Sequence, residues 1–293
     1  MGLVLVAAIA FSAKAIFVKL AYHYPIDALT LLTLRMGFSL PLFLALAWVA
    51  MRGAALQALT RREWIALIFL GLINYASSLL DFLGLQYVSA SLERLILFLF
   101  PTFVVVLSAL FFGYRIVRRD IFALAISYAG IALVFVHDLS TNQTDVALGA
   151  LFVLLSALCY AGYVVGSGQM VTRIGSLRFG TYAAIFSTSA IFVHFLLFCD
   201  ISQLKQPLPV LGIAGLMAVF STVLPILLMA EGIRRIGSSH ASMLGSVGPI
   251  ATIFMGYIFL DEAITAIQIA GAILVLIGVL AISLKKKPIT LSE

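Results

Sequence analysis

Residues 84–91 read GLQYVSAS, and 148 positions later residues 232–239 read GIRRIGSS. A proline follows ten residues after each stretch, at Pro101 and at Pro249. Other landmarks match at the same offset: Thr33, Phe38, Ser39 and Gly130 correspond to Thr181, Phe186, Ser187 and Gly278. The apolar segments fall into phase at this offset as well. We therefore expect one structural unit to occur twice in the chain.

The composition is that of a membrane protein. Hydrophobic residues make up 63% of the chain and charged residues only 10%, whereas about 25% of the residues in soluble proteins are charged. A membrane-spanning helix needs about 20 apolar residues. Ten such stretches can be drawn, near 2–21, 27–50, 64–87, 91–112, 121–137, 147–169, 178–198, 209–232, 240–260 and 265–284. The predicted fold class is an all-α membrane protein with ten transmembrane helices.

The repeat places five spans in each half, and an odd number of spans turns the second half over relative to the first. Inverted repeats of this kind are common in secondary transporters. We predict a first five-span repeat over 1–137, a second, inverted five-span repeat over 146–284, and a basic cytoplasmic tail over 285–293.

The net charge of +6 reflects membrane topology and not binding to nucleic acid. The clustered cations fall on one side of the predicted bilayer: Arg52, Arg61, Arg62, Arg115, Arg118, Arg119, Arg173, Arg178, Arg234, Arg235, Lys285, Lys286 and Lys287. The opposite loops carry Asp27, Asp138, Asp145, Asp200, Asp261 and Glu262, with Lys19 and Lys205 as their only clear cations. Because basic loops stay in the cytoplasm, we expect both termini there and the chain in the plasma (inner) membrane.

Five ionisable residues lie inside the predicted spans: Lys14, Arg35, Asp81, Glu93 and Arg94. Such groups are costly at bilayer depth and usually face a cavity or a partner. One interpretation is that they pair and only hold the first four spans together. The other interpretation is that the two carboxylates pair with two of the three cations. The third cation is then available to bind an anionic group such as a substrate carboxylate.

Smaller polar residues recur at helical spacing in both halves. Any one such stripe can be ordinary hydrogen bonding between helices, but several in corresponding spans predict a shared central cavity. The expected substrate-binding residues are Lys14, Arg35, Asn74, Ser78, Asp81, Glu93, Arg94, Tyr160, Tyr163, Ser221, Ser242 and Ser246. Because proline removes a backbone donor and bends a helix, the repeat partners Pro101 and Pro249 are candidate hinges.

Motifs of enzymes are missing from the sequence. It contains no HExxH, no GxSxG and no phosphate-binding loop, and its four histidines are dispersed without metal-ligand spacing. We therefore expect no catalytic activity, no bound metal and no cofactor.

The chain resembles the drug/metabolite transporter superfamily, in particular its EamA-type members. The resemblance rests on GLQYVSASLERLILFLFPTFVVVLSALFF (84–112), on IFLDEAITAIQIAGAILVLIGVLAI (258–282) and on the pair Leu34-Arg35. It implies ten spans in two inverted repeats around a central pocket. One position departs from the pattern, since Glu262 matches an acidic position of the family but its repeat counterpart is Tyr114.

The predicted function is secondary-active transport by alternating access, with export of small polar or amphipathic metabolites such as amino acids. A sugar or nucleotide-sugar exchanger and a non-transporting membrane receptor or scaffold are the alternatives. The expected partners are a small solute and the lipid bilayer. A proton that binds Asp81 or Glu93 is a candidate coupling ion.

Overall fold

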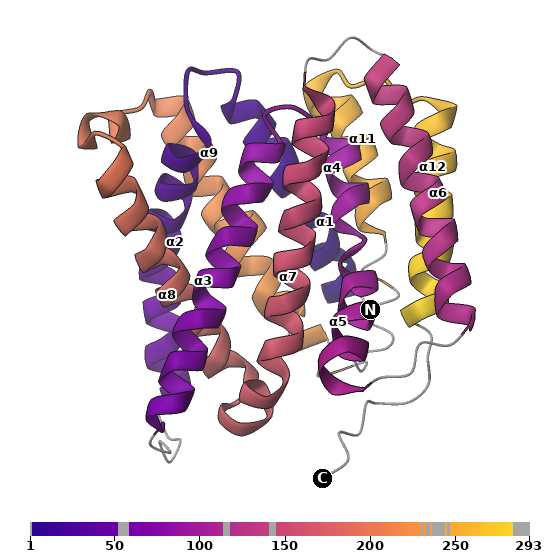
Figure 1. Cartoon of the computed structure of the whole chain (residues 1–293). Coiled ribbons are helices and arrows are strands. Elements are labelled where there is room, and N and C mark those ends of the chain that lie inside the picture. The colour runs from indigo at the N-terminus through magenta and orange to yellow at the C-terminus, as the bar shows by residue number, and fades with distance from the viewer. Residues whose placement is uncertain are drawn as a thin grey trace.

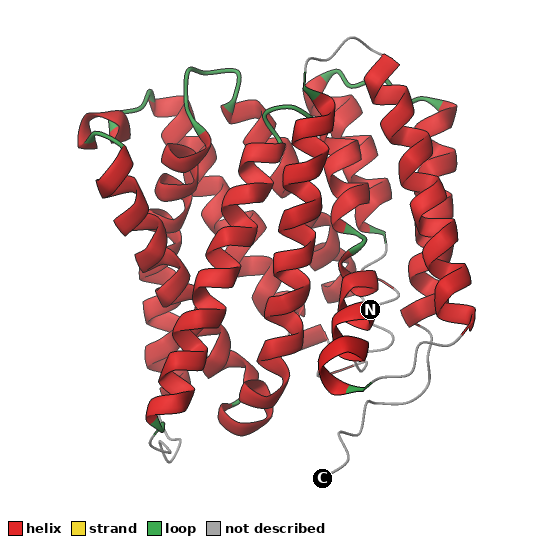
Figure 2. Ribbon diagram, in the orientation of Figure 1, coloured by secondary structure: helices red, strands yellow, loops and turns green. Residues whose placement is uncertain are grey.

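A computed structural model describes residues 2–51, 59–113, 118–140, 145–229, 231–232, 235, 244 and 247–283. Within these ranges the protein is a bundle of helices joined by short connections (Figures 1 and 2). The elements are α1 (Gly2–Ala21), α2 (Ala28–Met51), α3 (Arg61–Gly84), α4 (Ala90–Leu97), α5 (Phe100–Phe112), α6 (Arg118–Ser140), α7 (Val146–Ile174), α8 (Ser176–Phe198), η1 (Ile201–Leu204), α9 (Leu208–Ala218), η2 (Val219–Val223), α11 (Gly248–Leu260) and α12 (Ala266–Ser283).

The helices are long and apolar because a bilayer offers no water to satisfy backbone groups, which must bond within the helix itself. Seven helical segments of the described chain are long and apolar enough to cross a membrane. Three shorter apolar helices lie at Leu124–His137, Gly248–Leu260 and Ala266–Gly278. An all-helical membrane protein is therefore confirmed, while the count of ten spans stays a prediction.

The fourth predicted span, near 91–112, corresponds to one candidate span over Ala90–Phe111, which consists of two successive helices. The Ser89 side chain caps α4 by accepting a hydrogen bond of 3.1 Å from the backbone N–H of Leu92. The helix then ends at Leu97, and α5 begins at Phe100 with Pro101 in its first turn. Proline has no N–H to donate to the preceding turn, so a new helix starts around it.

Helices α5 and α11 have the same bounds at an offset of 148 residues. Each is 13 residues long, and each has a proline in its first turn. Each also ends at a residue with a left-handed backbone: Gly113 has a φ of 67° and Asp261 a φ of 54°. Glycine adopts this conformation without steric cost and aspartate tolerates it.

The most extensive described contact between the halves joins α6 to α12. A Cβ on Gly130 would lie 2.6 Å from the carbonyl oxygen of Gly271, and one on Gly271 would lie 2.7 Å from that of Gly130. Gly130 also adjoins Val275, while Gly271 adjoins Val134. The later residue in α6, Val134, thus lies beside the earlier residue in α12, Gly271, so the two helices are antiparallel.

Other contacts between the halves follow a matching pattern. Helix α1 packs on α11 as α7 packs on α5, and α3 packs on α8 as α9 packs on α2. Helices α1, α3, α4 and α7 meet near the middle of the bundle, where α3 contacts α7 and α4 contacts both α1 and α7. We call the end of the bundle where α3 finishes and α4 begins the Gly84 end, which is uppermost in Figure 1.

Candidate functional site

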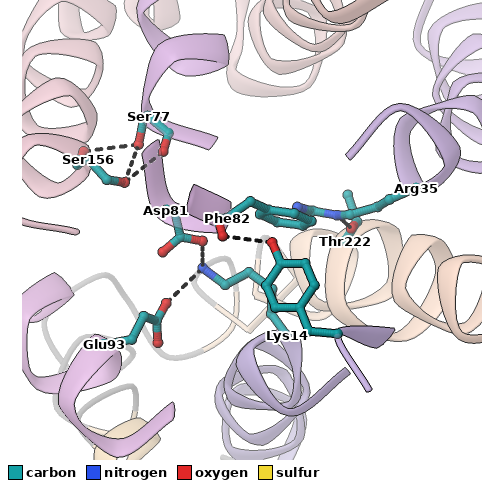
Figure 3. Close-up of polar contacts among 9 residues, drawn as sticks. Lys14, Arg35, Ser77, Asp81, Phe82, Glu93, Ser156 and Thr222 are labelled. Atoms are coloured by element: carbon teal, nitrogen blue, oxygen red, sulfur yellow. Dashed lines mark hydrogen bonds and ion pairs between the residues drawn. The ribbon is translucent and has the colours of Figure 1, made fainter. Parts of the chain in front are cut away.

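The charged residues of α1, α3 and α4 meet in one cluster inside the bundle. Lys14 Nζ donates to Asp81 Oδ2 at 2.5 Å and lies 3.1 Å from Glu93 Oε1. Figure 3 shows the ammonium group between the two carboxylates. The structure brings Lys14, Asp81 and Glu93 together, and the ammonium bridges three helices.

The cluster is withdrawn from the surface but is not saturated with hydrogen bonds. The Lys14 side chain is 16% exposed, that of Asp81 6% and that of Glu93 0%. Among the described residues, Asp81 Oδ1 and Glu93 Oε2 have no hydrogen-bond partner. Buried carboxylate oxygens without partners are costly, so these atoms can accept a proton or a polar group of a solute.

Arg94 and Tyr160 extend the cluster toward α7. The Arg94 guanidinium lies over the Phe98 ring at 5.6 Å, and both Arg94 and Lys14 are close enough to act electrostatically on the Tyr160 hydroxyl. The Tyr160 ring stacks on Tyr163 at 6.1 Å. Tyr160 is 39% exposed and lies beside the charged cluster.

Arg35 forms a second polar site, at the junction of α2 and η2. Its Nε donates to Thr222 Oγ1 at 2.9 Å, and its guanidinium lies over the Phe82 ring at 5.4 Å (Figure 3). Arg35 is 8% exposed, and no carboxylate of the described chain lies within ion-pair distance of it. An arginine has five N–H donors, so its terminal nitrogens retain the capacity to bind an anionic group.

The Thr222 side chain reaches Arg35 because the chain has an i→i+5 turn there. Thr222 lies in η2, a π-helical segment that interrupts the run of α9. Both Thr222 and Ser221 donate to the carbonyl oxygen of Met217, at 3.0 and 2.9 Å. Such single π turns inside α-helices often occur at functional sites. Of the two neighbouring hydroxyls, the structure brings Thr222, and not the expected Ser221, to the charged residue.

The remaining expected residues are placed as follows. Asn74 and Ser78 are partly buried on the face of α3 that also carries Asp81. Ser242 and Ser246 lie outside the described residues. Pro101 lies in the first turn of α5 and Pro249 in the first turn of α11, each beside the start of a helix, where a change of direction is easiest.

Several hydroxyl contacts, whose partners the sequence did not indicate, hold the helices around the cluster. Ser12 Oγ, one half-turn before Lys14, donates to the carbonyl oxygen of Gly248 at 2.9 Å. Tyr22 OH donates to the carbonyl oxygen of Phe82 at 2.7 Å. Ser156 Oγ donates to the carbonyl oxygen of Ser77 at 2.7 Å. A hydroxyl within an apolar span is a signal for such contacts, but its partner is not readable from the sequence.

The described residues hold no group of three or more His, Cys, Asp or Glu side chains that could bind a metal ion. The site consists of charged groups, hydroxyls and aromatic rings, which are able to form ion pairs and hydrogen bonds with a polar solute.

Comparison with known proteins gives matches over nearly the whole chain. The family described as "EamA-like transporter family" matches residues 1–136 and 147–284. The uncharacterized transporter YcbK of Bacillus subtilis strain 168 is 32% identical over 279 residues, which cover 91% of this chain and 87% of that protein. The uncharacterized transporter YyaM of the same organism is 27% identical, over 76% of this chain and 74% of that protein.

Two further matches concern function and fold. The pseudopaline exporter CntI of Pseudomonas aeruginosa strain UCBPP-PA14 is 25% identical over 83% of this chain and 82% of that protein. A solved structure, described only as a crystal structure of a protein, shares the fold with a TM-score of 0.64 at 15% identity. It covers 95% of this chain and 94% of the solved chain.

Proposed function

Because the chain belongs to the EamA-like transporter family, we propose that it is a secondary carrier that exports small polar or amphipathic metabolites, with amino acids as the leading candidates. The family resemblance read from the sequence is confirmed. The named relatives are transporters, and the apolar helices make this protein a multi-pass membrane protein.

The observation that carries the substrate proposal is the unequal charge of the interior. Three cations (Lys14, Arg35 and Arg94) accompany two carboxylates (Asp81 and Glu93), which leaves one positive charge. Lys14 contacts both carboxylates, while Arg35 binds a neutral hydroxyl and a ring face. Arg35 is therefore the proposed anchor for a substrate carboxylate, with Tyr160 and Tyr163 as apolar and hydrogen-bonding walls.

Two inverted five-helix repeats, over 1–137 and 146–284, are the proposed architecture for alternating access. The matching bounds of α5 and α11, the antiparallel contact of α6 with α12 and the matching helix contacts of the two halves support this proposal. Rocking of one half against the other would expose the charged cluster to each side of the membrane in turn.

Export is the proposed direction, and a proton is the proposed coupling ion. The name of the pseudopaline exporter, a relative over most of its length, favours export. Asp81 and Glu93 share one ammonium group and have unbonded buried oxygens. Protonation of one carboxylate would weaken its hold on Lys14, so that uptake of a proton would change the contacts of this cation with α3 and α4.

The proposed location is the plasma (inner) membrane with both termini in the cytoplasm, as the distribution of basic loops indicates. Reporter fusions at the two termini test this topology. Termini found on opposite sides would overturn the arrangement of two five-span halves.

Efflux from proteoliposomes tests the carrier proposal. Vesicles loaded with single labelled amino acids, or with nucleotide-sugars for the exchanger alternative, are compared with and without an imposed pH gradient. We expect saturable efflux of at least one amino acid that the gradient accelerates. Flux of nucleotide-sugars without flux of amino acids would favour the exchanger alternative over amino acid export. Flux that the pH gradient does not change would exclude the proton as the coupling ion. If folded protein transports none of the solutes, the carrier proposal is overturned.

A further inference from the structure

Glu262, in the short connection between α11 and α12, binds the first turn of α4. Its Oε1 accepts a hydrogen bond of 2.9 Å from the backbone N–H of Ala90, and its Oε2 accepts one of 3.1 Å from the hydroxyl of Ser91. The first N–H groups of a helix have no partner within the helix, and a carboxylate is favoured at this positive end of the helix dipole. Glu262 thus completes the cap that Ser89 begins.

The backbone around Glu262 is shaped for this contact. The residue before it, Asp261, has a φ of 54°, and the Glu262 N–H donates to the carbonyl oxygen of Gly256 at 3.2 Å. A Cβ on Gly256 would lie only 2.9 Å from Glu262 Oε2. Only a residue without a side chain leaves the carboxylate room to turn toward α4.

The contact joins residues 172 positions apart, from different halves of the chain. It lies at the Gly84 end, where α4 starts and α11 finishes. Helix α4 is eight residues long, is separated from α5 by the break before Pro101 and carries Glu93 and Arg94. Its direction therefore depends on what holds its first turn.

We propose that Glu262 is a positioning residue: it fixes the first turn of α4 so that Glu93 faces Lys14, and its hydrogen bonds to α4 break when the bundle opens at the Gly84 end during transport. The opening step rests on the proposed carrier function, whereas the fixing of α4 does not. The repeat counterpart of Glu262 is Tyr114, which has no carboxylate, so the sequence offers no second acidic residue at the equivalent position.

The test measures how often the first turn of α4 is exposed, and it needs no transported solute. Purified protein with Cys159→Ala and Cys199→Ala carries a single cysteine, Leu92→Cys, at a fully buried position of α4. N-ethylmaleimide is the probe, and lipid nanodiscs make both faces accessible. Adding Glu262→Ala should raise the labelling rate about tenfold, because two hydrogen bonds to a charged acceptor are lost.

Conservative and neighbouring variants separate positioning from general loosening. Glu262→Gln should give an intermediate rate, because its amide oxygen still accepts from the Ala90 N–H, and Asp261→Asn should leave the rate unchanged. A second reporter, Leu67→Cys, lies on α3, is also fully buried and is near the other end of the bundle; Glu262→Ala should not change its labelling.

Equal labelling of Leu92→Cys with and without Glu262 would overturn the proposal, and so would a rise at both reporters, which indicates a merely structural role. If Glu262→Ala does not fold, the comparison of Glu262→Gln with Asp261→Asn decides: an unchanged rate in Glu262→Gln together with faster labelling in Asp261→Asn would overturn it. In proteoliposomes that transport a solute, Glu262→Gln should change the maximal rate with little change in KM. Absence of transport by every form of the protein would count against the carrier proposal and leave the labelling result intact.

Discussion

Lys14 on α1 and Asp81 on α3 form an ion pair in the interior of the bundle, with 2.5 Å between Nζ and Oδ2. The second carboxylate on the same ammonium, that of Glu93, comes from α4. One cation therefore ties three helices of the first half together at the point where the second half contributes α7 and α11. Any relative movement of these helices must change the contacts of Lys14, and any solute anion that binds Lys14 must compete with two carboxylates.

Replacement of Lys14 by alanine is expected to abolish transport and leave the amount of protein in the membrane unchanged. Without the ammonium, the two buried carboxylates can take up protons and become neutral, which spares the fold. The measurements are efflux from proteoliposomes and the abundance of the protein in membranes. Lys205→Ala, in an exposed connection, is the matched control and should transport normally. Full activity of Lys14→Ala would remove this residue from the mechanism.

Asp81→Asn and Glu93→Gln are expected to flatten the dependence of transport on pH. Lower pH favours the protonated carboxylates, which release Lys14, and an amide can neither bind nor release a proton. Efflux at a series of external pH values measures the effect, with Ser77→Ala as the control on the same helix as Asp81. A variant that keeps the full pH dependence would show that its carboxylate does not carry the coupling proton.

Arg35→Lys is expected to raise the KM for a substrate with a carboxylate about tenfold or more, because lysine lacks the planar group that binds carboxylates through two parallel hydrogen bonds. Thr222→Val removes the acceptor for Arg35 Nε and should have a smaller effect in the same direction. Its control is Ser221→Ala, since the Ser221 hydroxyl donates to the carbonyl oxygen of Met217. Equal effects of Thr222→Val and Ser221→Ala would argue against a role for the Arg35 contact.

Gly130→Ala is expected to lower the stability of the protein by about 1–3 kcal/mol, the usual cost of overpacking. The added Cβ would lie 2.6 Å from the carbonyl oxygen of Gly271, so α6 and α12 must move apart. Gly212→Ala is the control, because nothing lies within 4 Å of the position of its Cβ. Thermal unfolding in detergent measures both. Equal melting temperatures for the two variants would contradict the close packing of α6 on α12.

The sequence determined the helical membrane character of the protein, because apolar length is a local property and every backbone group in a bilayer must bond within its own helix. It also placed Pro101 and Pro249 at equivalent positions of the repeat. It identified five charged residues inside apolar spans, where pairing or a binding role is expected: Lys14, Arg35, Asp81, Glu93 and Arg94. The fourth predicted span, near 91–112, is confirmed as a span over Ala90–Phe111, while the break between Leu97 and Phe100 is visible in the sequence only as Pro101.

Only the tertiary structure decided which of these groups meet. Thr222 and not Ser221 binds Arg35 because a π turn rotates the helix by part of a turn, a change that no regular period predicts. Glu262 caps a helix 172 residues away because α11 and α4 pack side by side. Hydropathy and helical period specify which face of a helix is polar, but the neighbour of that face depends on how helices from both halves pack, and that is a property of the whole bundle.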